Sequence, residues 1–496
     1  MEIVGISNPA GAPTDQGQDQ GQDRDQNRPH RRAAFLVVAA AVFVSNLDLF
    51  IVNVALPAMQ QHFHGSSLAT LSWVLNGYAI VFAALLVPAG RLADRIGHRR
   101  VFLAGLAVFT AASALCALAP AVGWLDAARV VQAAGAAALM PTSLALLLDA
   151  TAPAERPGAI RAWASIGGIA AGLGPVLGGL LVEADWRWVF IVNVPVGIAA
   201  IAVGARVLPG LRRNEKGKQN SKENGTENGP LPDLFGAVLL TAAIATLTVS
   251  LVKGDDWGWT SPQVLGSLLA AALLTGWFLR RSARHHAPIV ELPLLRVPSF
   301  AAANTAALLF TLAFSGMLLT SVLWCQQVWE YSALRTGLAI APGPLLVPPV
   351  ALGSAALVRR LGPGRLAALG TLLFAAGIAW WTAAIGVRPG YTTELLPGML
   401  LTGLGVGLTL PTLIGSAAAA LPPTRFATGS AITTMVRQIG AVVGVALTVS
   451  LIGTPDGPQA ALDGFRRGWT AVIAAALLAC TAALALAAAQ RRAAAK

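Results

Sequence analysis

AAFLVVAAAVFVSNLDLFIVNVALP, residues 33–57, is an apolar stretch whose single charged side chain is Asp48. A helix needs about 20 mainly apolar residues to cross the hydrocarbon core of a bilayer. The stretch therefore predicts a membrane-spanning helix, and a carboxylate at its centre. The stretch is too long for a signal-peptide core and has no cleavage-like flank.

Comparable apolar stretches recur along the rest of the chain. We place fourteen spans at 33–57, 70–89, 101–120, 124–148, 159–182, 187–208, 233–253, 260–279, 300–324, 333–358, 366–387, 394–418, 428–452 and 468–489. The predicted fold class is therefore an all-α integral membrane protein with about fourteen transmembrane helices.

The composition supports this fold class. Of the 496 residues, 55% are hydrophobic and only 12% are charged, whereas a soluble domain is about 25% charged. The net charge of +12 does not indicate nucleic acid, because the basic residues stand in short clusters between apolar stretches, as in membrane loops. They favour alternate loops, which predicts that both termini are cytoplasmic.

An internal repeat divides the chain. The segment GRLADRIGHRR at 90–100 is similar to AALVRRLGPGR at 355–365, and paired glycines recur in later helices of each part. We expect two parallel six-helix halves with a substrate site between them. The predicted segments are a disordered cytoplasmic N-terminus 1–32, the halves 33–208 and 300–489, a cytoplasmic linker 209–232, a two-helix insert with its following loop 233–299, and a cytoplasmic tail 490–496.

Several site types are absent from the sequence. There is no GxxxxGK[ST] phosphate loop, so ATP is not the energy source within this chain. The histidines lack paired cysteine or carboxylate ligands, which argues against a metal site. The three cysteines lie in or beside apolar stretches and are expected to be unpaired. No cofactor is predicted.

Four motifs carry a resemblance to a known family: NLDLFIVNVALP at 46–57, GRLADRIGHRR at 90–100, ARVVQAAGAA at 128–137 and GLGPVLGGLL at 172–181. WRWVFIVNVPVG at 186–197 and MVRQIGAVVGVA at 435–446 add to it. Together and in this order they resemble the fourteen-helix drug/proton antiporter branch of the major facilitator superfamily. The resemblance implies a proton-coupled exporter of small amphipathic compounds such as drugs or antibiotics, with possible resistance as a consequence.

The candidate proton-coupling or substrate residues are Asp48, Arg129 and Gln132. An ionised carboxylate in mid-membrane is costly, which suits a group that binds protons reversibly. Arg129 can hold Asp48 ionised until a proton or substrate competes, and Gln132 lies on the same helical face. The alternatives are a static structural carboxylate and an arginine that extends to the outer interface. Phe50 stands where the family usually has a hydroxyl.

The resemblance also implies roles for two other groups. The loop residues Gly90, Asp94, Arg95, Gly97 and Arg100 match a conformational latch between the halves; the alternative is simple membrane anchoring. The helix 5 residues Gly172, Gly174, Pro175, Gly178 and Gly179 match the antiporter motif, and glycines four apart let helices pack closely. Arg437 is a possible site in the second half, facing either an anionic substrate group or a helix C-terminus.

The expected partners are a small-molecule substrate, protons and the lipid bilayer, without nucleic acid or ATP. The protein is expected in the cell membrane, active as a monomer. Alternatives are export or uptake of one specific metabolite, or a membrane enzyme or sensor. Neither an enzymatic side-chain constellation nor an added signalling domain is evident.

Overall fold

The computed structural model describes residues 28–149, 151, 156–208, 233–421, 425–453 and 457–494. Within these residues, thirteen helical spans are long and apolar enough to cross a membrane, and Ile169–Ala184 forms a shorter apolar helix. The predicted all-α membrane fold is confirmed. Most of the predicted N-terminal segment and the whole linker 209–232 lie outside the described residues.

The first half contains six spans. They are built from α2 (Arg28–His62), α3 (Leu68–Leu71) with α4 (Trp73–Ile96), α5 (His98–Ala117), α6 (Val122–Asp149), α7 (Arg156–Ala184), and α8 (Trp188–Ile191) with α9 (Asn193–Val207). Because α2 begins at Arg28, the prediction of disorder is wrong for residues 28–32. These residues extend the helix in the N-terminal direction.

The insert contains two spans, α11 (Leu234–Val252) and α13 (Pro262–Arg284), joined through the short helix α12 (Gly254–Trp257). A 3-10 turn, η3 (Leu292–Arg296), leads from the insert into the second half. Asp233 caps α11 by accepting a hydrogen bond from the Gly236 amide at 2.8 Å. This capping fixes where the insert begins.

The second half contains the remaining spans. They are α14 (Pro298–Leu323) with η4 (Trp324–Val328), α15 (Ala333–Ile340) with α16 (Pro342–Gly353) and α17 (Ala355–Leu361), α18 (Pro363–Ala384), η5 (Tyr391–Leu395) with α19 (Leu396–Ala419), α20 (Phe426–Ile452) and α21 (Pro458–Ala494). The predicted span 333–358 is divided into three helices, and Pro342 stands at the start of the second. α21 also extends into the predicted tail.

Equivalent pairs of helices within each half pack through equivalent glycines. A Cβ atom added to Gly135 would lie 2.7 Å from the Gly105 carbonyl oxygen, and one added to Gly405 would lie 2.6 Å from that of Gly370. These contacts join α5 to α6 and α18 to α19. The two predicted repeat loops also share a backbone feature: Gly97 and Gly362 have φ values of +102° and +79°, which favour glycine.

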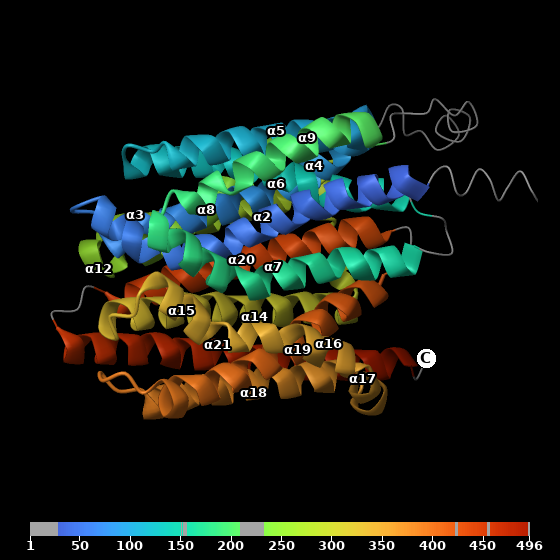
Figure 1. The fold of residues 1–496 in the computed structure, drawn as a ribbon. Coiled ribbons are helices and arrows are strands. Elements are labelled where there is room, and N and C mark those ends of the chain that lie inside the picture. The colour runs from blue at the N-terminus through green and yellow to red at the C-terminus, as the bar shows by residue number, and fades with distance from the viewer. Residues whose placement is uncertain are drawn as a thin grey trace, which may run out of the picture.

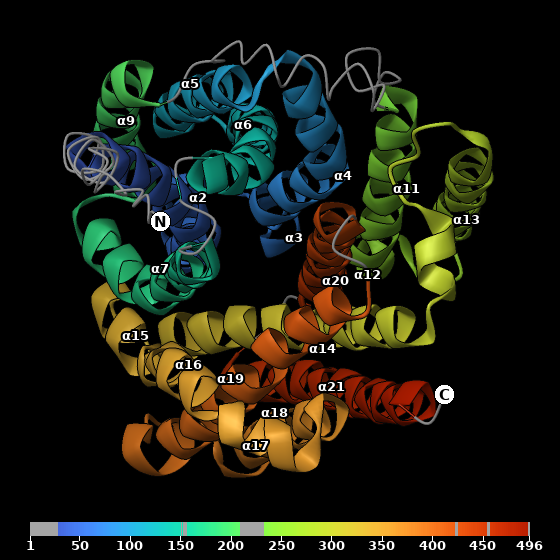
Figure 2. The ribbon, with the colours of Figure 1, turned by 90° about the vertical axis from the view of Figure 1, so that its right-hand side faces the viewer.

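The helices lie side by side as one elongated bundle (Figure 1). α2 begins and α21 ends at the same end of this bundle, which we call the termini end; the opposite end is the far end. Viewed from the termini end, α2 to α9 form one group and α14 to α21 another (Figure 2). α11 and α13 lie on one flank, and α13 is the outermost helix there.

Candidate functional site

Asp48 lies within α2 and has no exposed surface. Its carboxylate accepts hydrogen bonds from two side chains of α6. The Arg129 Nη1 group donates to Oδ2 at short range, and the Gln132 Nε2 group donates to Oδ1 at 2.9 Å. The structure therefore brings together the three residues predicted as a coupling or substrate site.

Arg129 is fixed on every side. Its Nε donates to the Val74 carbonyl oxygen at 3.0 Å, and Nη1 also donates to Gln132 Oε1 at 2.7 Å. Its guanidinium carbon lies 4.1 Å from the centre of the Tyr78 ring. With 1% of its surface exposed, Arg129 does not extend to the interface, which excludes that alternative for this conformation.

Two further members of the network were not predicted as site residues. Asn193, at the start of α9, donates to Asp48 Oδ1 at 3.0 Å, and Gln132 Nε2 donates to Ser113 Oγ at 2.8 Å. Asn193 and Ser113 are both fully buried. A signal was present, because Asn193 is a polar residue within the otherwise apolar part of the quoted motif, residues 188–197. Its partner was not visible in the sequence.

Among the described residues, the hydrogen-bond partners of the Asp48 carboxylate are all donors: a guanidinium and two amide nitrogens. Removing one partner of a buried ion pair costs about 3–5 kcal/mol, because an uncompensated charge remains. Breaking the Asp48–Arg129 pair within this packing of the helices would therefore be costly.

The glycine-rich segment of α7 packs against both halves. A Cβ atom on Gly174 would lie 2.6 Å from Phe50 Cβ, and one on Gly178 would lie 3.1 Å from the Ile51 carbonyl oxygen, both in α2. A Cβ atom on Gly179 would lie 2.5 Å from the Ala333 carbonyl oxygen at the start of α15. α7 thus joins the helix that carries Asp48 to the other half.

Two further residues of this α7 segment also contact the second half. We call the surface where α7 meets α15 and α16 the seam. The carbonyl oxygen of Pro175 would lie 2.2 Å from a Cβ atom on Gly337 of α15. Gly172 faces α16, where the Pro344 carbonyl oxygen would lie 3.7 Å from an added Cβ atom. All five residues predicted from the helix 5 motif therefore lie on the helix that contacts both halves.

Polar contacts between the halves are found at the far end. Gln326 Nε2 donates to the Val54 carbonyl oxygen at 3.1 Å, and Gln327 Nε2 donates to Gln60 Oε1 at 3.2 Å. Val54 and Gln60 follow Asp48 on α2. The described chain is therefore closed at the far end by contacts that include the helix of Asp48.

The predicted latch residues lie at the termini end. Gly97 ends α4, and a Cβ atom added to Gly90 would lie 3.4 Å from Pro141 Cβ in α6. Asp94 is 72% exposed and lies 3.2 Å from His98 Nε2 within its own segment. Arg95 and Arg100 are exposed. In this conformation, the described hydrogen bonds of the segment 90–100 stay within the first half.

Arg437 lies near the middle of α20 and is half-buried. Its Nε atom is enclosed and has no hydrogen-bond partner among the described residues, and the same is true of the neighbouring Gln438 Nε2. The structure does not bring Arg437 into the Asp48 network. Within the described part of the chain, these two enclosed donors therefore lack a partner.

The chain was then compared with known proteins. Residues 38–445 match the family model described as Major Facilitator Superfamily. The chain is 35% identical to the probable actinorhodin transporter of Streptomyces coelicolor, over 90% of this chain and 77% of that protein. It is 34% identical to the tetracenomycin C resistance and export protein of Streptomyces glaucescens, over 77% and 68% of the two chains.

Solved structures share the fold. A protein from a structural study of substrate recognition in proton-dependent oligopeptide transporters superimposes with a TM-score of 0.65. The alignment covers 92% of this chain and 99% of that one, at 14% sequence identity. At this identity the likeness concerns the arrangement of helices alone.

Proposed function

The chain belongs to the major facilitator superfamily, as a multi-pass transporter related to antibiotic and drug export proteins, and on that premise we propose that it is a proton-coupled antiporter. It exports small amphipathic compounds, drugs or antibiotics, across the cell membrane. Both termini are cytoplasmic, and the monomer is the working unit. The observation that carries the proposal is the enclosed network around Asp48.

Asp48 is the coupling group in this proposal. Its ionised form satisfies the donors of Arg129, Gln132 and Asn193. A bound proton removes the charge that holds Arg129 and places a hydroxyl among donors. The protonated state therefore favours a different packing of α2 against α6 and α9, which links proton binding to conformation.

The helix α2 provides a route from this site to the far end. Gln60 lies twelve residues after Asp48, about 18 Å along an α-helix, and accepts the hydrogen bond from Gln327 of the other half. A shift of α2 on protonation therefore changes the contacts that close the far end. Because α7 packs closely on both α2 and α15, α7 must move together with α2.

Arg437 is the proposed substrate anchor in the second half. The Nε group of Arg437 and the Nε2 group of Gln438, which have no partner among the described residues, fit an acidic or strongly polar substituent on an otherwise apolar compound. Asp48 and Arg129 are enclosed in the first half, so they do not contact substrate in this conformation. Substrate recognition and proton binding are thereby assigned to different halves.

The names of the relatives support export over the other transport alternatives. One is described as a probable actinorhodin transporter and the other as a tetracenomycin C resistance and export protein. Export or uptake of one specific metabolite remains the second candidate. An enzyme is excluded by the family, whose members are transporters.

The test is transport in everted membrane vesicles from a host that lacks its own efflux pumps. A drug-susceptibility panel first identifies a compound to which expression confers resistance. Accumulation of that compound in vesicles is then measured with an imposed pH gradient and after its collapse by an uncoupler. We expect accumulation only with the gradient, and acidic compounds among the best substrates. Accumulation that survives the uncoupler would remove proton coupling from the proposal.

A further inference from the structure

The helix α13 is the least buried of the thirteen long apolar spans. Only 17% of its most apolar 18-residue segment is buried inside the protein. Leu265, Leu269, Leu273 and Trp277 are spaced four apart and are 54–65% exposed. Because residues four apart share a helical face, they form a continuous apolar stripe. It runs about 18 Å along the helix, slightly more than half of a bilayer's hydrocarbon core of about 30 Å.

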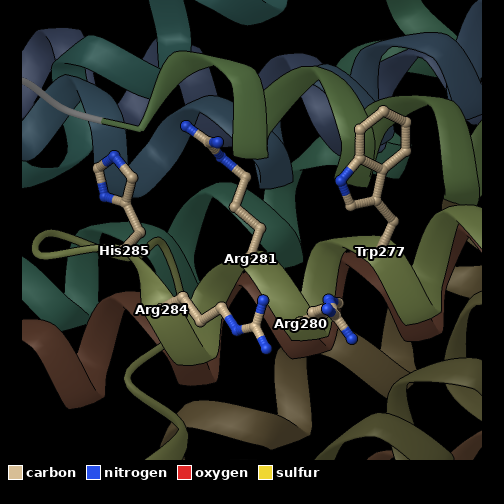
Figure 3. Close-up of a pocket in the computed structure, with 5 residues that line it drawn as sticks. All are labelled: Trp277, Arg280, Arg281, Arg284 and His285. Carbon is tan, nitrogen blue, oxygen red and sulfur yellow. The ribbon is translucent and has the colours of Figure 1, made fainter.

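A basic pocket stands where this stripe reaches the termini end. It has a volume of about 250 Å³ and is lined by Trp277, Arg280, Arg281, Arg284 and His285 (Figure 3). Trp277 belongs to both the stripe and the pocket. Its exposed indole is of the type that collects at the level of lipid headgroups.

One arginine of the pocket is held in place. Arg281 Nε donates to Asp233 Oδ1 at 2.7 Å, and its guanidinium carbon lies 5.0 Å from the centre of the Phe235 ring. The Phe235 ring in turn packs edge-on against Trp277, with centroids 5.5 Å apart. These contacts between α11 and α13 thus fix one side of the pocket before a ligand binds.

The other two arginines of the pocket have no carboxylate partner among the described residues. Arg280 and Arg284 are exposed and form no ion pair within the described ranges, where the salt bridges involve other residues. The pocket contains three arginines, and the carboxylate of Asp233 balances the charge of one of them. Two positive charges therefore remain. His285 Nδ1 accepts a hydrogen bond from the Ala287 amide at 3.1 Å, so a neutral His285 carries its proton on Nε2 as a further donor.

We propose that this pocket binds the phosphate headgroup of an anionic phospholipid, whose acyl chain lies along the α13 stripe. Two guanidinium groups attract the single negative charge of a phosphate diester and can donate hydrogen bonds to both of its non-bridging oxygens. The apolar stripe begins at the pocket and has the length of one leaflet, which a free phosphate ion would not use. Basic pockets between transmembrane helices are suited to anionic lipid headgroups.

The test is native mass spectrometry of the full chain, titrated in mild detergent with phosphatidylglycerol or phosphatidylcholine. The variant is Arg280→Gln with Arg284→Gln, which leaves the Arg281–Asp233 pair intact. The matched control is Arg491→Gln with Arg492→Gln, because these exposed arginines lie at the same end on α21 and their loss removes the same charge. Size-exclusion profiles and thermal unfolding establish that both variants fold.

We expect phosphatidylglycerol to bind in preference to phosphatidylcholine and the pocket variant to bind it about thirtyfold more weakly, since each arginine near anionic lipid contributes a factor of about five. The control variant retains wild-type binding. An equal loss in both variants would reduce the effect to general surface charge and overturn the site. Displacement of the lipid by millimolar inorganic phosphate would overturn the lipid assignment in favour of a free anion.

Discussion

Asn193 donates a hydrogen bond to Asp48 Oδ1 at 3.0 Å, joining two residues that are 145 positions apart in the sequence. Together with Arg129 and Gln132, it surrounds the carboxylate with donors from α6 and α9. The proposed coupling group is therefore bound to three of the six spans of its half, including its own. A change in its charge acts on all of them.

Replacing Asp48 by Asn imitates the protonated state. We expect Asp48→Asn to abolish accumulation against a gradient while exchange without net proton transfer survives. The unpaired Arg129 should also lower stability by about 3–5 kcal/mol. Everted vesicles with an imposed pH gradient and thermal unfolding measure the two effects.

The control for Asp48→Asn is Asp256→Asn, an exposed residue paired with Lys253 on the insert, which should transport normally. Combining Asp48→Asn with Arg129→Gln should recover stability but not uphill transport. Wild-type pumping by Asp48→Asn would mean that another residue carries the proton.

Replacing Gly179 by Ala places a Cβ atom 2.5 Å from the Ala333 carbonyl oxygen and 2.8 Å from Leu334 Cα. Because both are backbone atoms, the halves must separate at the far end. We expect Gly179→Ala to insert normally and to transport at least about tenfold more slowly, since overpacking costs about 1–3 kcal/mol. Gly266→Ala on α13 meets no atom within 4 Å and should leave the rate unchanged. Equal rates for the two variants would contradict a close seam between α7 and α15.

Replacing Asp94 by Asn tests the latch. Within the described residues its carboxylate pairs with His98, so we expect any latch to the second half to form in another state of the cycle. We expect Asp94→Asn to slow transport at least about tenfold, a loss of more than 1.4 kcal/mol, while insertion stays normal. His98→Gln, which removes the contact seen here, should transport nearly normally. If His98→Gln were the slower variant, the loop would act through the first half alone.

A crosslink between positions 60 and 327 tests the closure of the far end. Gln327 Nε2 lies 3.2 Å from Gln60 Oε1, and the native cysteines are all buried. In a variant with those cysteines replaced, Gln60→Cys with Gln327→Cys should react with a short thiol crosslinker and lose transport, which reductant restores. Either single variant should remain active after the same treatment. Full transport by the crosslinked protein would show that the far end need not open.

The orientation of the termini is tested by two reporter cysteines. Ala493→Cys at the end of α21 and Trp257→Cys in α12 stand at opposite ends of the bundle, and both positions are exposed. In intact cells, an impermeant thiol reagent should label position 257 and not position 493. The reverse pattern would place the termini outside.

The fold was largely predictable because lipid imposes a simple rule on sequence. A span must be apolar over about 20 residues, so the helices and the charges within them stand out. The division of the span 333–358 was less evident, since prolines are tolerated in membrane helices where neighbours satisfy the backbone. The packing of equivalent glycines in the two halves could be expected from the repeat.

The candidate site was predictable only in part. Asp48 and Arg129 are conspicuous because charges in an apolar helix are costly. Asn193 and Ser113 are not, because small polar side chains are frequent in membrane helices and bond to their own backbone. Their role depends on which faces of α5 and α9 meet α2, and only the assembled bundle determines that. The α13 pocket likewise needed α11 beside it.

The pairing of Asp48 with Arg129 inside one half has an electrical consequence. When the halves move relative to each other, the carboxylate and the guanidinium travel together, so the pair carries no net charge across the membrane field. In the proposed proton-coupled cycle, the membrane voltage, worth about 2.3 kcal/mol per elementary charge per 100 mV, therefore acts through the bound proton and the substrate. The charge of the exported compound should then determine how strongly voltage drives its export.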